Sequence, residues 1–466
     1  MKKAILKITA MMIALSAVLF IASCNDDNDD PTPIVEDEYE VLEGSITSSV
    51  ALDASKQYLL RGKVYVQSGA TLTIPAGTKV YGEKDTDGTL IINRGGKIDA
   101  QGTADNPIVM TSQADPGFRN RGDWGGVVIL GKAYTNGSAS STIEGISSTA
   151  GSEDGVYGPG NSAPADDDNS GVMRYVRIEF AGIALSQDNE LNSLTMGAVG
   201  SGTQIDHIMV SYANDDAYEW FGGANNHKYL VAYSTLDDDF DTDRGYIGKV
   251  QHALVVRDPN QADFSGSRAW ESSSNNTANV GDLPNHGGTA RHSAPTFANV
   301  TVLGPRLFRA PGAINGFYQA ALEINSSSSI KIYNSILTGF TTGVRWNNSG
   351  ESAMVTNNVF AHHGASTAVS GSSTVPGDFA TTNTEEADIQ TIFGNYPSGS
   401  LYNFDAPPFF QAGASPYLTG APAMSTIDPF FDDVDYYGAF GTAAGTEWNF
   451  NSGWIEWNPV DVAYEE

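Results

Sequence analysis

Cysteine is almost absent from the sequence: Cys24 is the only one, so no disulfide can form within the chain. Basic residues are also scarce, with 25 Lys and Arg against 55 Asp and Glu and a net charge of −30 at pH 7. A surface this acidic repels polyanions, so we expect no nucleic-acid partner. No stretch combines an apolar pattern of helical period with helix caps, which argues against an α-helical fold.

The N-terminus contains the one long apolar run of the chain. Three lysines lie before or within it and small residues follow it, as in a secretory signal peptide, here residues 1–23. The sequence IASC at 21–24 resembles a bacterial lipobox, which implies a lipid on Cys24 and anchoring to a membrane. Residues 24–44 are acidic and poor in aliphatic side chains, which predicts a flexible tether. The tether resembles the surface-export signal of Bacteroidetes-type lipoproteins, which implies a position on the outer face of the outer membrane.

Short β runs fill most of the remaining sequence. Segments such as YLLRGKVYVQSGA (58–70) and TLTIPAGTKVYG (71–82) are rich in Val, Ile, Leu, Thr and Tyr and are bounded by residues that favour turns. The 50 glycines likewise indicate many turns. The sequence therefore predicts an all-β fold.

A repeat of 22 residues distinguishes between all-β architectures. VSYANDDAYEWFGG (210–223) aligns with AYSTLDDDFDTDRG (232–245), which places Asp215 over Asp237 and Glu219 over Asp241. This period suits three short strands per turn, and it predicts a single-stranded right-handed parallel β-helix, a solenoid, over residues 45–390. A β-sandwich is the alternative, but it gives no reason for the repeat.

Polar insertions and an aromatic C-terminal region complete the predicted organisation. Residues 135–171, 271–295 and 364–388 are nearly free of large apolar side chains and predict surface loops, where we expect a surface glycan or a protein partner to bind. Residues 391–466 are rich in Phe, Tyr and Trp and are expected to cap the last turn, whose core and strand edges would otherwise be exposed. A carbohydrate-stacking surface is the alternative for these aromatic residues.

Several stretches together resemble the β-helical surface lipoproteins of Bacteroidetes-type bacteria. They are GATLTIPAGTKVYG (69–82), GDWGGVVILGKA (122–133), DDDNSGVMRYVRIEFAG (166–182), NDDAYEWFGG (214–223) and DDDFDTDRGYIGK (237–249). The resemblance implies a pectin-lyase-like fold for nearly the whole mature chain. The architecture is more distantly similar to that of pectate lyases and polygalacturonases, which is a likeness of fold alone.

An aspartate cluster is the candidate functional site. If residues 237–243 form one extended strand, alternate side chains point to the same side. Carboxylates at such spacing repel one another unless a cation binds, protons are taken up or water screens them. Together with the preceding turn, the cluster predicts a metal site formed by Asp215, Asp216, Asp237, Asp239, Asp241 and Asp243.

Three interpretations of this cluster stay open. In the first, Ca²⁺ binds between turns, because it takes six to eight oxygen ligands and residues 239–243 offer several of them. An EF-hand is excluded, because Val250 stands where that loop requires a glutamate. In the second, the cluster is catalytic; in the third, it is a hydrated turn ladder with Arg244 and Lys249 as counter-ions.

The catalytic interpretation rests on the two more distant resemblances. The resemblance to polygalacturonases implies paired aspartates that act as general acid and general base. NDD at 214–216 and NHGG at 285–288 resemble parts of such a site. The resemblance to pectate lyases implies a bound calcium ion and an arginine or lysine that acts as the base. The candidates for that base are Arg244, Lys249, Arg257 and Arg268.

Aromatic and basic side chains near the cluster are candidate ligand-binding residues, namely Trp220, Arg244, Lys249 and Trp270. The seven histidines lack the short spacing of a zinc site. We therefore expect a calcium-stabilised, non-catalytic binding or structural module at the cell surface. A calcium-dependent polysaccharide lyase or a glycoside hydrolase is the alternative.

Overall fold

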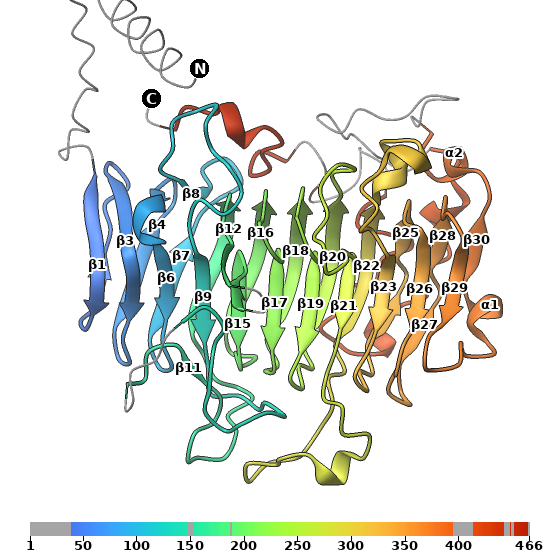
Figure 1. The fold of residues 1–466 in the computed structure, drawn as a ribbon, viewed down its shortest axis with the longest axis horizontal. Helices are drawn as coiled ribbons and strands as arrows, with labels where there is room; N and C mark the ends of the chain where they lie inside the picture. Colours follow the sequence, from blue (N-terminus) through green and yellow to red (C-terminus); the bar gives the residue numbers. More distant parts are fainter. Residues whose placement is uncertain are drawn as a thin grey trace, which may run out of the picture. The chain divides into compact units, whose positions relative to one another are not determined.

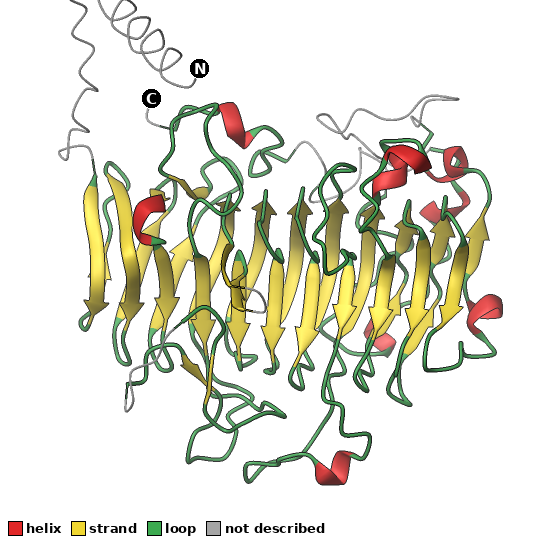
Figure 2. Ribbon diagram, in the orientation of Figure 1, coloured by secondary structure: helices red, strands yellow, loops and turns green. Residues whose placement is uncertain are grey.

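The computed structural model describes residues 39–146, 152–186, 189–394, 413–441, 448 and 452–464, and Tyr39–Glu466 forms one compact unit. The signal peptide, Cys24 and most of the tether lie outside the described residues. The described chain winds as a parallel β-helix, which confirms the predicted fold class (Figures 1 and 2). No described helix is long and apolar enough to cross a membrane.

Three parallel sheets form the faces of the coil, and we number them I, II and III. Sheet I begins in the second half of β3 (Gln57–Val66). Its further strands are β6 (Thr89–Ile92), β9 (Gly126–Leu130), β15 (Leu194–Gly197), β17 (Tyr218–Phe221), β19 (Phe240–Asp243), β21 (Trp270–Ser272), β23 (Ala320–Ile324), β26 (Thr342–Trp346) and β29 (Ser366–Ser370).

Sheets II and III share five long strands that bend from one face to the next. These are β12 (Gly171–Glu179), β16 (Gln204–Ser211), β18 (Asn226–Tyr233), β20 (Lys249–Val256) and β22 (Thr296–Leu303). Sheet II also contains β2 (Val50–Ala51), β4 (Thr71–Pro75), β7 (Lys97–Gln101), β24 (Lys331–Tyr333) and β27 (Met354–Thr356). Sheet III also contains β1 (Glu40–Ile46), β5 (Lys79–Gly82), β8 (Ile108–Ser112), β25 (Ile336–Thr338), β28 (Val359–Ala361) and β30 (Thr384–Glu386).

The remaining elements are short. Two antiparallel pairs lie in loops, β10 (Ser141–Thr142) with β11 (Val156–Tyr157) and β13 (Ile183–Ser186) with β14 (Asn189–Leu191). The α-helices are α1 (Phe379–Thr382) and α2 (Ile389–Ile392). Single 3₁₀ turns occur at Lys84–Thr86, Val280–Asp282, Pro305–Leu307, Pro311–Ala313, Pro416–Leu418, Met424–Thr426 and Pro459–Asp461.

The predicted 22-residue register is confirmed in the stacked turns. Glu219 lies beside Asp241, and Gln204 lies beside Asn226. Because like residues recur at like positions, the alternating inward side chains form continuous columns in the core, such as Tyr218, Phe240 and Trp270. Each fully buried side chain of this kind contributes about 1.5–3 kcal/mol, so the columns supply the main stabilisation of the coil.

A stack of rings marks the bend between sheets II and III. Tyr175, His207, Tyr229 and His252 each adopt a left-handed backbone conformation there, with φ between 49° and 60°. Their ring centroids lie 4.1, 4.3 and 5.2 Å apart in sequence order. We call these four residues the corner ladder. A non-glycine residue in this conformation costs about 1–2 kcal/mol, which the stacking of the rings offsets in part.

The aromatic C-terminal segment lies along the flank of the coil, not over its last turn as expected. Tyr417 donates to Glu386 of β30, whereas Trp448 packs edge-on against Tyr229 of the corner ladder. The end of the described chain reaches back to the early turns (Figure 1), where Tyr464 belongs to the same buried cluster as Tyr81. The corner ladder exposes a column of rings along this flank, and burying that column explains the path of the segment.

The last turn is covered by another part of the chain. Phe379 of α1 packs against Trp346 and Phe360. The prediction that 364–388 is an insertion is wrong, because this stretch forms β29, α1 and β30 and continues the coil. Residues 364–388 are polar because they form the final turn, whose strands β29 and β30 are partly exposed.

The other two insertions pack together beyond the ends of the sheet I strands. Arg291 forms an ion pair of 2.6 Å with Asp166, and the ring of His286 is 3.0 Å from the carbonyl oxygen of Gly137. Figure 1 shows both insertions extending below the coil. The two stretches that sequence analysis marked as candidate recognition loops therefore form one joined surface.

Candidate functional site

A row of acidic side chains runs across the outer face of sheet I. Successive rungs place Glu219, Asp241, Glu271 and Glu323 side by side on β17, β19, β21 and β23. We call these four residues the acidic row. Arg345 of β26 follows Glu323 in the same register, with a distance of 3.8 Å from its Nη1 to the glutamate Oε2. Like charges therefore occupy four consecutive rungs before a positive charge appears.

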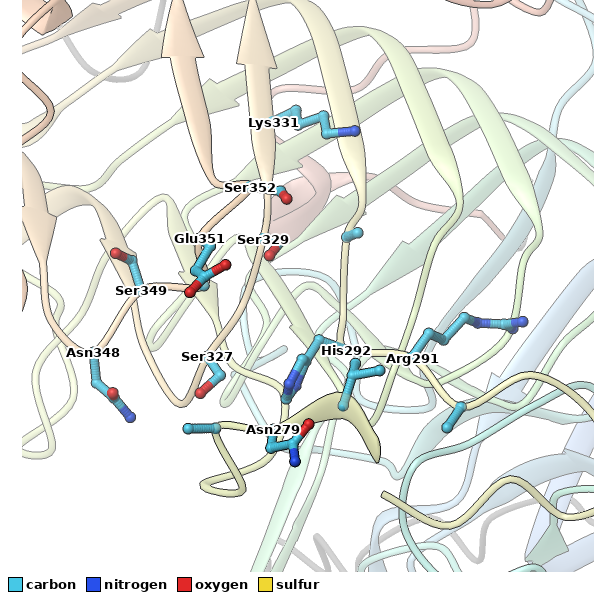
Figure 3. Close-up of a pocket in the computed structure, with 15 residues that line it drawn as sticks. Asn279, Arg291, His292, Ser327, Ser329, Lys331, Asn348, Ser349, Glu351 and Ser352 are labelled. Atoms are coloured by element: carbon cyan, nitrogen blue, oxygen red, sulfur yellow. The ribbon is translucent and has the colours of Figure 1, made fainter. Parts of the chain in front are cut away.

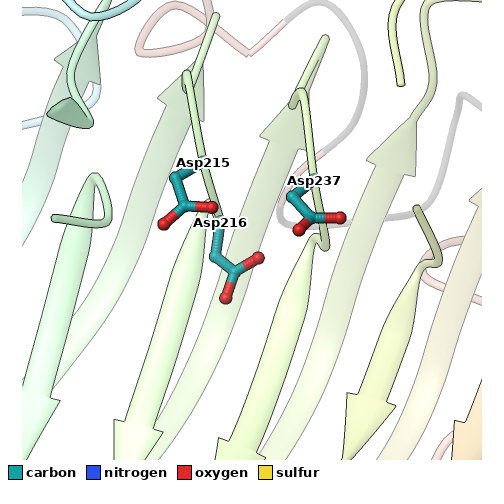
Figure 4. Close-up of side chains that lie close together, drawn as sticks. All are labelled: Asp215, Asp216 and Asp237. Carbon is teal, nitrogen blue, oxygen red and sulfur yellow. The ribbon is translucent and has the colours of Figure 1, made fainter. Parts of the chain in front are cut away.

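The turns before β17 and β19 add further carboxylates at one end of this row. Figure 4 shows Asp215 and Asp216 on one turn and Asp237 on the next. The backbone stacks here as predicted, because the Asp238 amide donates to Asp216 Oδ1 at 2.8 Å and the Asp216 amide to Asn192 Oδ1 at 3.1 Å.

Two groups of three carboxylates bring one oxygen atom from each residue within 4.8 Å of one another. They are Asp215, Asp216 and Asp237, and Asp216, Glu219 and Asp241. Opposite oxygen ligands of a calcium ion are about 5 Å apart, so each group is compact enough to share one Ca²⁺. One oxygen atom of Asp237 and one of Asp241 are buried and accept no hydrogen bond. The donor set is all oxygen, as Ca²⁺ requires.

Burial and mutual repulsion raise the pKa values of these carboxyl groups. Burial raises the pKa of Asp237 to about 7, and the nearby Asp263 adds to the rise. Burial and the charge of Asp237 raise the pKa of Asp215 well above its ordinary value. Burial and the charge of Asp215 do the same for Asp216. Without a cation, the site holds protons at a pH where isolated aspartates are ionised.

Arg268 neutralises the far side of the row. Its guanidinium lies 3.5 Å from Asp238, 2.7 Å from Glu271 and 2.8 Å from Glu323. Since three carboxylates already hold Arg268 in place, it cannot act readily as a free base. Neither group of three carboxylates includes a residue that pairs with Arg268.

The prediction that the odd-numbered aspartates share one side holds for Asp241 and Asp243 but is wrong for Asp239. β18 ends at Tyr233, the chain bends between Ser234 and Asp239, and the next strand begins only at Phe240. Asp239 is fully buried and lies 3.1 Å from the guanidinium of Arg257, which is also fully buried. Asp239 therefore belongs to an internal ion pair and is not available to a metal shared with Asp216.

Asp243 and Arg244 lie at the other end of β19. The Arg244 Nε is 3.4 Å from Asp243 Oδ2, and 45% of the arginine side chain is exposed. Arg244 lines a cavity of about 290 Å³ together with Glu144, Tyr157 and Phe221. Of the four candidate ligand-binding residues, Arg244 alone faces a cavity beside sheet I among the pockets found in the described residues.

The structure corrects the expected positions of the other three candidates. Trp220 and Trp270 are fully buried core residues, so neither ring can stack on a sugar. Trp220 donates to His227 Nε2 at 3.0 Å inside the coil. Lys249 lies on sheet II and pairs with Asp428 at 2.9 Å, so it is not a counter-ion of the acidic row.

The histidines noted in the sequence lie away from the aspartate cluster. His286 of the NHGG stretch lies in the joined loops, where it contacts Gly137, and does not face the aspartates. His207 and His252 belong to the corner ladder, where Tyr229 stands between them, whereas His227 is buried inside the coil.

Sequence reasoning missed Glu271, Glu323, Asp263 and Glu144. The first could have been found by extending the repeat, because AWESSS (269–274) falls in register with DFDTDR (239–244) after a longer loop. Glu323 lies one rung further, after a still longer loop. Asp263 and Glu144 lie in irregular loops, and no periodic signal marks them.

The comparisons with known proteins agree with this architecture. The searches of curated proteins and of solved structures found no match. A family model described as a pectate-lyase-like beta helix domain matches residues 44–395, about three quarters of the sequence. The chain therefore belongs to the pectate-lyase-like beta-helix family.

Proposed function

We propose that this protein is a surface-exposed outer-membrane lipoprotein whose β-helix acts as a non-catalytic binding module stabilised by Ca²⁺. The observation that carries the calcium proposal is the sharing of Asp216 between two compact groups of carboxylates. The first group contains Asp215 and Asp237, and the second contains Glu219 and Asp241. A bound cation would remove the repulsion that raises their pKa values.

Several features favour Ca²⁺ over other cations. The two groups contain no histidine or cysteine, which zinc prefers. The carboxylates come from turns and strand positions of irregular arrangement, and Ca²⁺ tolerates irregular coordination better than Mg²⁺ does. Backbone carbonyls and water would complete the coordination of a Ca²⁺ held by three carboxylates.

The positions of the basic side chains support a non-catalytic role. Arg257 is enclosed with Asp239, Arg268 is held by three carboxylates and Lys249 lies on another sheet. A lyase needs a basic side chain that is free to take a proton from its substrate. Three of the four candidate bases are therefore committed to other partners.

Thermal unfolding of the full chain with calcium and with EDTA tests the calcium proposal. At a calcium concentration 100 times Kd, binding stabilises the folded state by about 2.7 kcal/mol. We expect the rise in unfolding temperature to vanish in Asp216→Asn, which keeps the oxygen that accepts from the Asp238 amide. Asp105→Asn, at an exposed loop position, is the matched control and should respond as wild type does. Equal unfolding temperatures of the wild type with calcium and with EDTA would contradict the proposal.

Arg244 favours a second candidate function, a calcium-dependent polysaccharide lyase or a glycoside hydrolase. Its side chain is 45% exposed and lines the cavity at the end of β19 together with Glu144, so a basic group and a carboxyl group border the same space. A screen of the full chain against uronate and neutral polysaccharides tests this function. Cleavage that Arg244→Gln abolishes, while the calcium response remains, would replace the non-catalytic proposal.

The lipoprotein part of the proposal has its own test. The wild-type protein should incorporate a radiolabelled fatty acid. On intact cells, a protease added from outside should cleave it. Cys24→Ser should incorporate no label, because the thiol is the only one in the chain. Labelling of Cys24→Ser at the wild-type level would contradict lipidation at this position.

A further inference from the structure

A second pocket in the described part of the chain is formed by residues other than those of the acidic row. It has a volume of about 830 Å³ and lies between the second insertion and the turns that follow β23 and β26 (Figure 3). Because these turns follow sheet I strands, whereas Asp216 precedes one, the pocket and the proposed calcium site lie at opposite ends of that sheet. We call this cavity the turn pocket.

The wall of the turn pocket is held by backbone hydrogen bonds between successive turns. The Ser329 amide donates to the Ser293 carbonyl at 2.8 Å, and the Ser327 amide to the Asn348 carbonyl at 2.7 Å. Ser327 and Asn348 both adopt positive φ values, 66° and 54°. The shape of this wall is therefore fixed by the coil itself.

The side chains on this wall have hydrogen-bonding capacity that the protein does not use. Within the described part of the chain, six of them make no hydrogen bond or ion pair: Ser329, Lys331, Asn348, Ser349, Glu351 and Ser352. On the opposite wall, Arg291 pairs with Asp166 and His292 contacts Ser274. Free hydroxyl, amide, amine and carboxylate groups thus lie along one side of the pocket (Figure 3).

The charges on the wall restrict the class of ligand. Arg291 also lines the pocket, but its charge is balanced by Asp166. Lys331 and Glu351 carry one charge of each sign, so neither an anion nor a cation gains a large net attraction. A sugar hydroxyl both donates and accepts hydrogen bonds, so it can pair with every one of these groups.

We propose that the turn pocket binds a neutral oligosaccharide. The volume is within the range of about 300–1,000 Å³ that ligand pockets occupy, and the set of polar groups matches a ligand rich in hydroxyl groups. The inference rests on the proposed binding role of the β-helix, but it is independent of the calcium site, since no residue of either carboxylate group lines the pocket.

Binding of the full chain to an array of neutral and uronate oligosaccharides tests the inference. We expect binding to at least one neutral oligosaccharide, and we expect Glu351→Ala and Lys331→Met each to weaken it about tenfold, since each removes a charged hydrogen-bonding group. Ser352→Trp, at an exposed position on the rim, should block the pocket without disturbing the core. Lys97→Met, an exposed lysine on sheet II away from the pocket, is the matched control.

Three results would overturn the inference: no neutral oligosaccharide bound, uronates bound alone, or binding that Ser352→Trp leaves unchanged. The array is also run in EDTA and with Asp216→Asn. Binding that persists under both conditions supports the turn pocket even if the protein gives no calcium response. A calcium response without any sugar binding overturns the pocket and leaves the calcium proposal standing.

Discussion

Two ladders of stacked side chains run through overlapping turns of the coil on different flanks. The corner ladder stacks the rings of Tyr175, His207, Tyr229 and His252, and the C-terminal segment covers them. The acidic row stacks carboxylates at the spacing of neighbouring strands. A parallel register places like residues on like residues, which favours rings and opposes charges. The first ladder is therefore stable by itself, whereas the second needs protons, an arginine or a cation.

The buried ion pair beneath the acidic row offers the largest expected effect. Arg257→Met leaves the fully buried Asp239 without its partner, and breaking such a pair costs about 3–5 kcal/mol. Denaturant unfolding measures the loss. The double variant Asp239→Leu/Arg257→Met should recover most of it, because no buried charge remains. A single variant as stable as the wild type would contradict the assignment of this pair as the inner support of the site.

The cover of the corner ladder comes next. Trp454 packs edge-on against His207 and Tyr175 and is almost fully buried, so Trp454→Ala should cost about 3 kcal/mol. Thermal unfolding measures it, and Phe118→Ala, at a largely exposed aromatic position, is the control. Because this ladder contains no cluster of like charges, the loss should be equal with calcium and with EDTA. If calcium restored the stability of Trp454→Ala, the corner ladder would respond to calcium as the acidic row is expected to, and the difference between the two ladders would be contradicted.

The third prediction concerns pH. The folded-state pKa values of Asp237 and Asp239, about 7 and about 6, lie above their ordinary value of 3.8. The protonated form is thus favoured by folding, so this stabilisation is complete below about pH 4 and is lost as the pH rises through 6 to 7. In EDTA, the unfolding temperature of wild type should fall over this range by several degrees more than that of Asp237→Asn. Calcium should abolish the difference, and parallel pH profiles of the two proteins in EDTA would contradict the interpretation.

The smallest effect is expected at the exposed end of the row. Asp243 pairs with Arg244 at 3.4 Å where the arginine is nearly half exposed, and such pairs contribute about 0.2–1 kcal/mol. Asp243→Asn should therefore change the free energy of unfolding by less than about 1 kcal/mol and leave the calcium response intact. Loss of that response would move the site toward Asp243.

The sequence was sufficient for the architecture and for the register of the acidic residues. Glu219 and Asp241 could be paired because the 22-residue repeat is unbroken there. The sidedness of Asp239 could not be predicted, since it depends on where the strand begins after a turn at Ser234. The burial of Trp220 and Trp270 could not be predicted either. Alternation does not say which face of a strand points inward when both faces contain polar and aromatic residues.

Contacts between distant segments account for the remaining errors. Lys249 meets Asp428, and Arg268 meets Glu323 across 55 residues of sequence. Loop lengths between these partners are irregular, so neither a repeat nor a local pattern links them. The first group of three carboxylates comes from two adjacent turns, so the repeat could predict that its members lie together. The repeat could not predict the arginines that neutralise the neighbouring carboxylates.

The return of the C-terminal segment changes how the coil must fold. In an ordinary repeat protein each turn touches only its neighbours, so stability accumulates locally and folding can begin anywhere and spread. Here Tyr464 donates to Glu179 at 2.8 Å across 285 residues, and this contact joins the last residues of the chain to its early turns. Contacts of such sequence separation slow folding and bind the turns into one cooperative unit. The early coils consequently remain incomplete during synthesis until the C-terminus has left the ribosome, and loss of the last few residues should loosen the end of the molecule farthest from them in sequence.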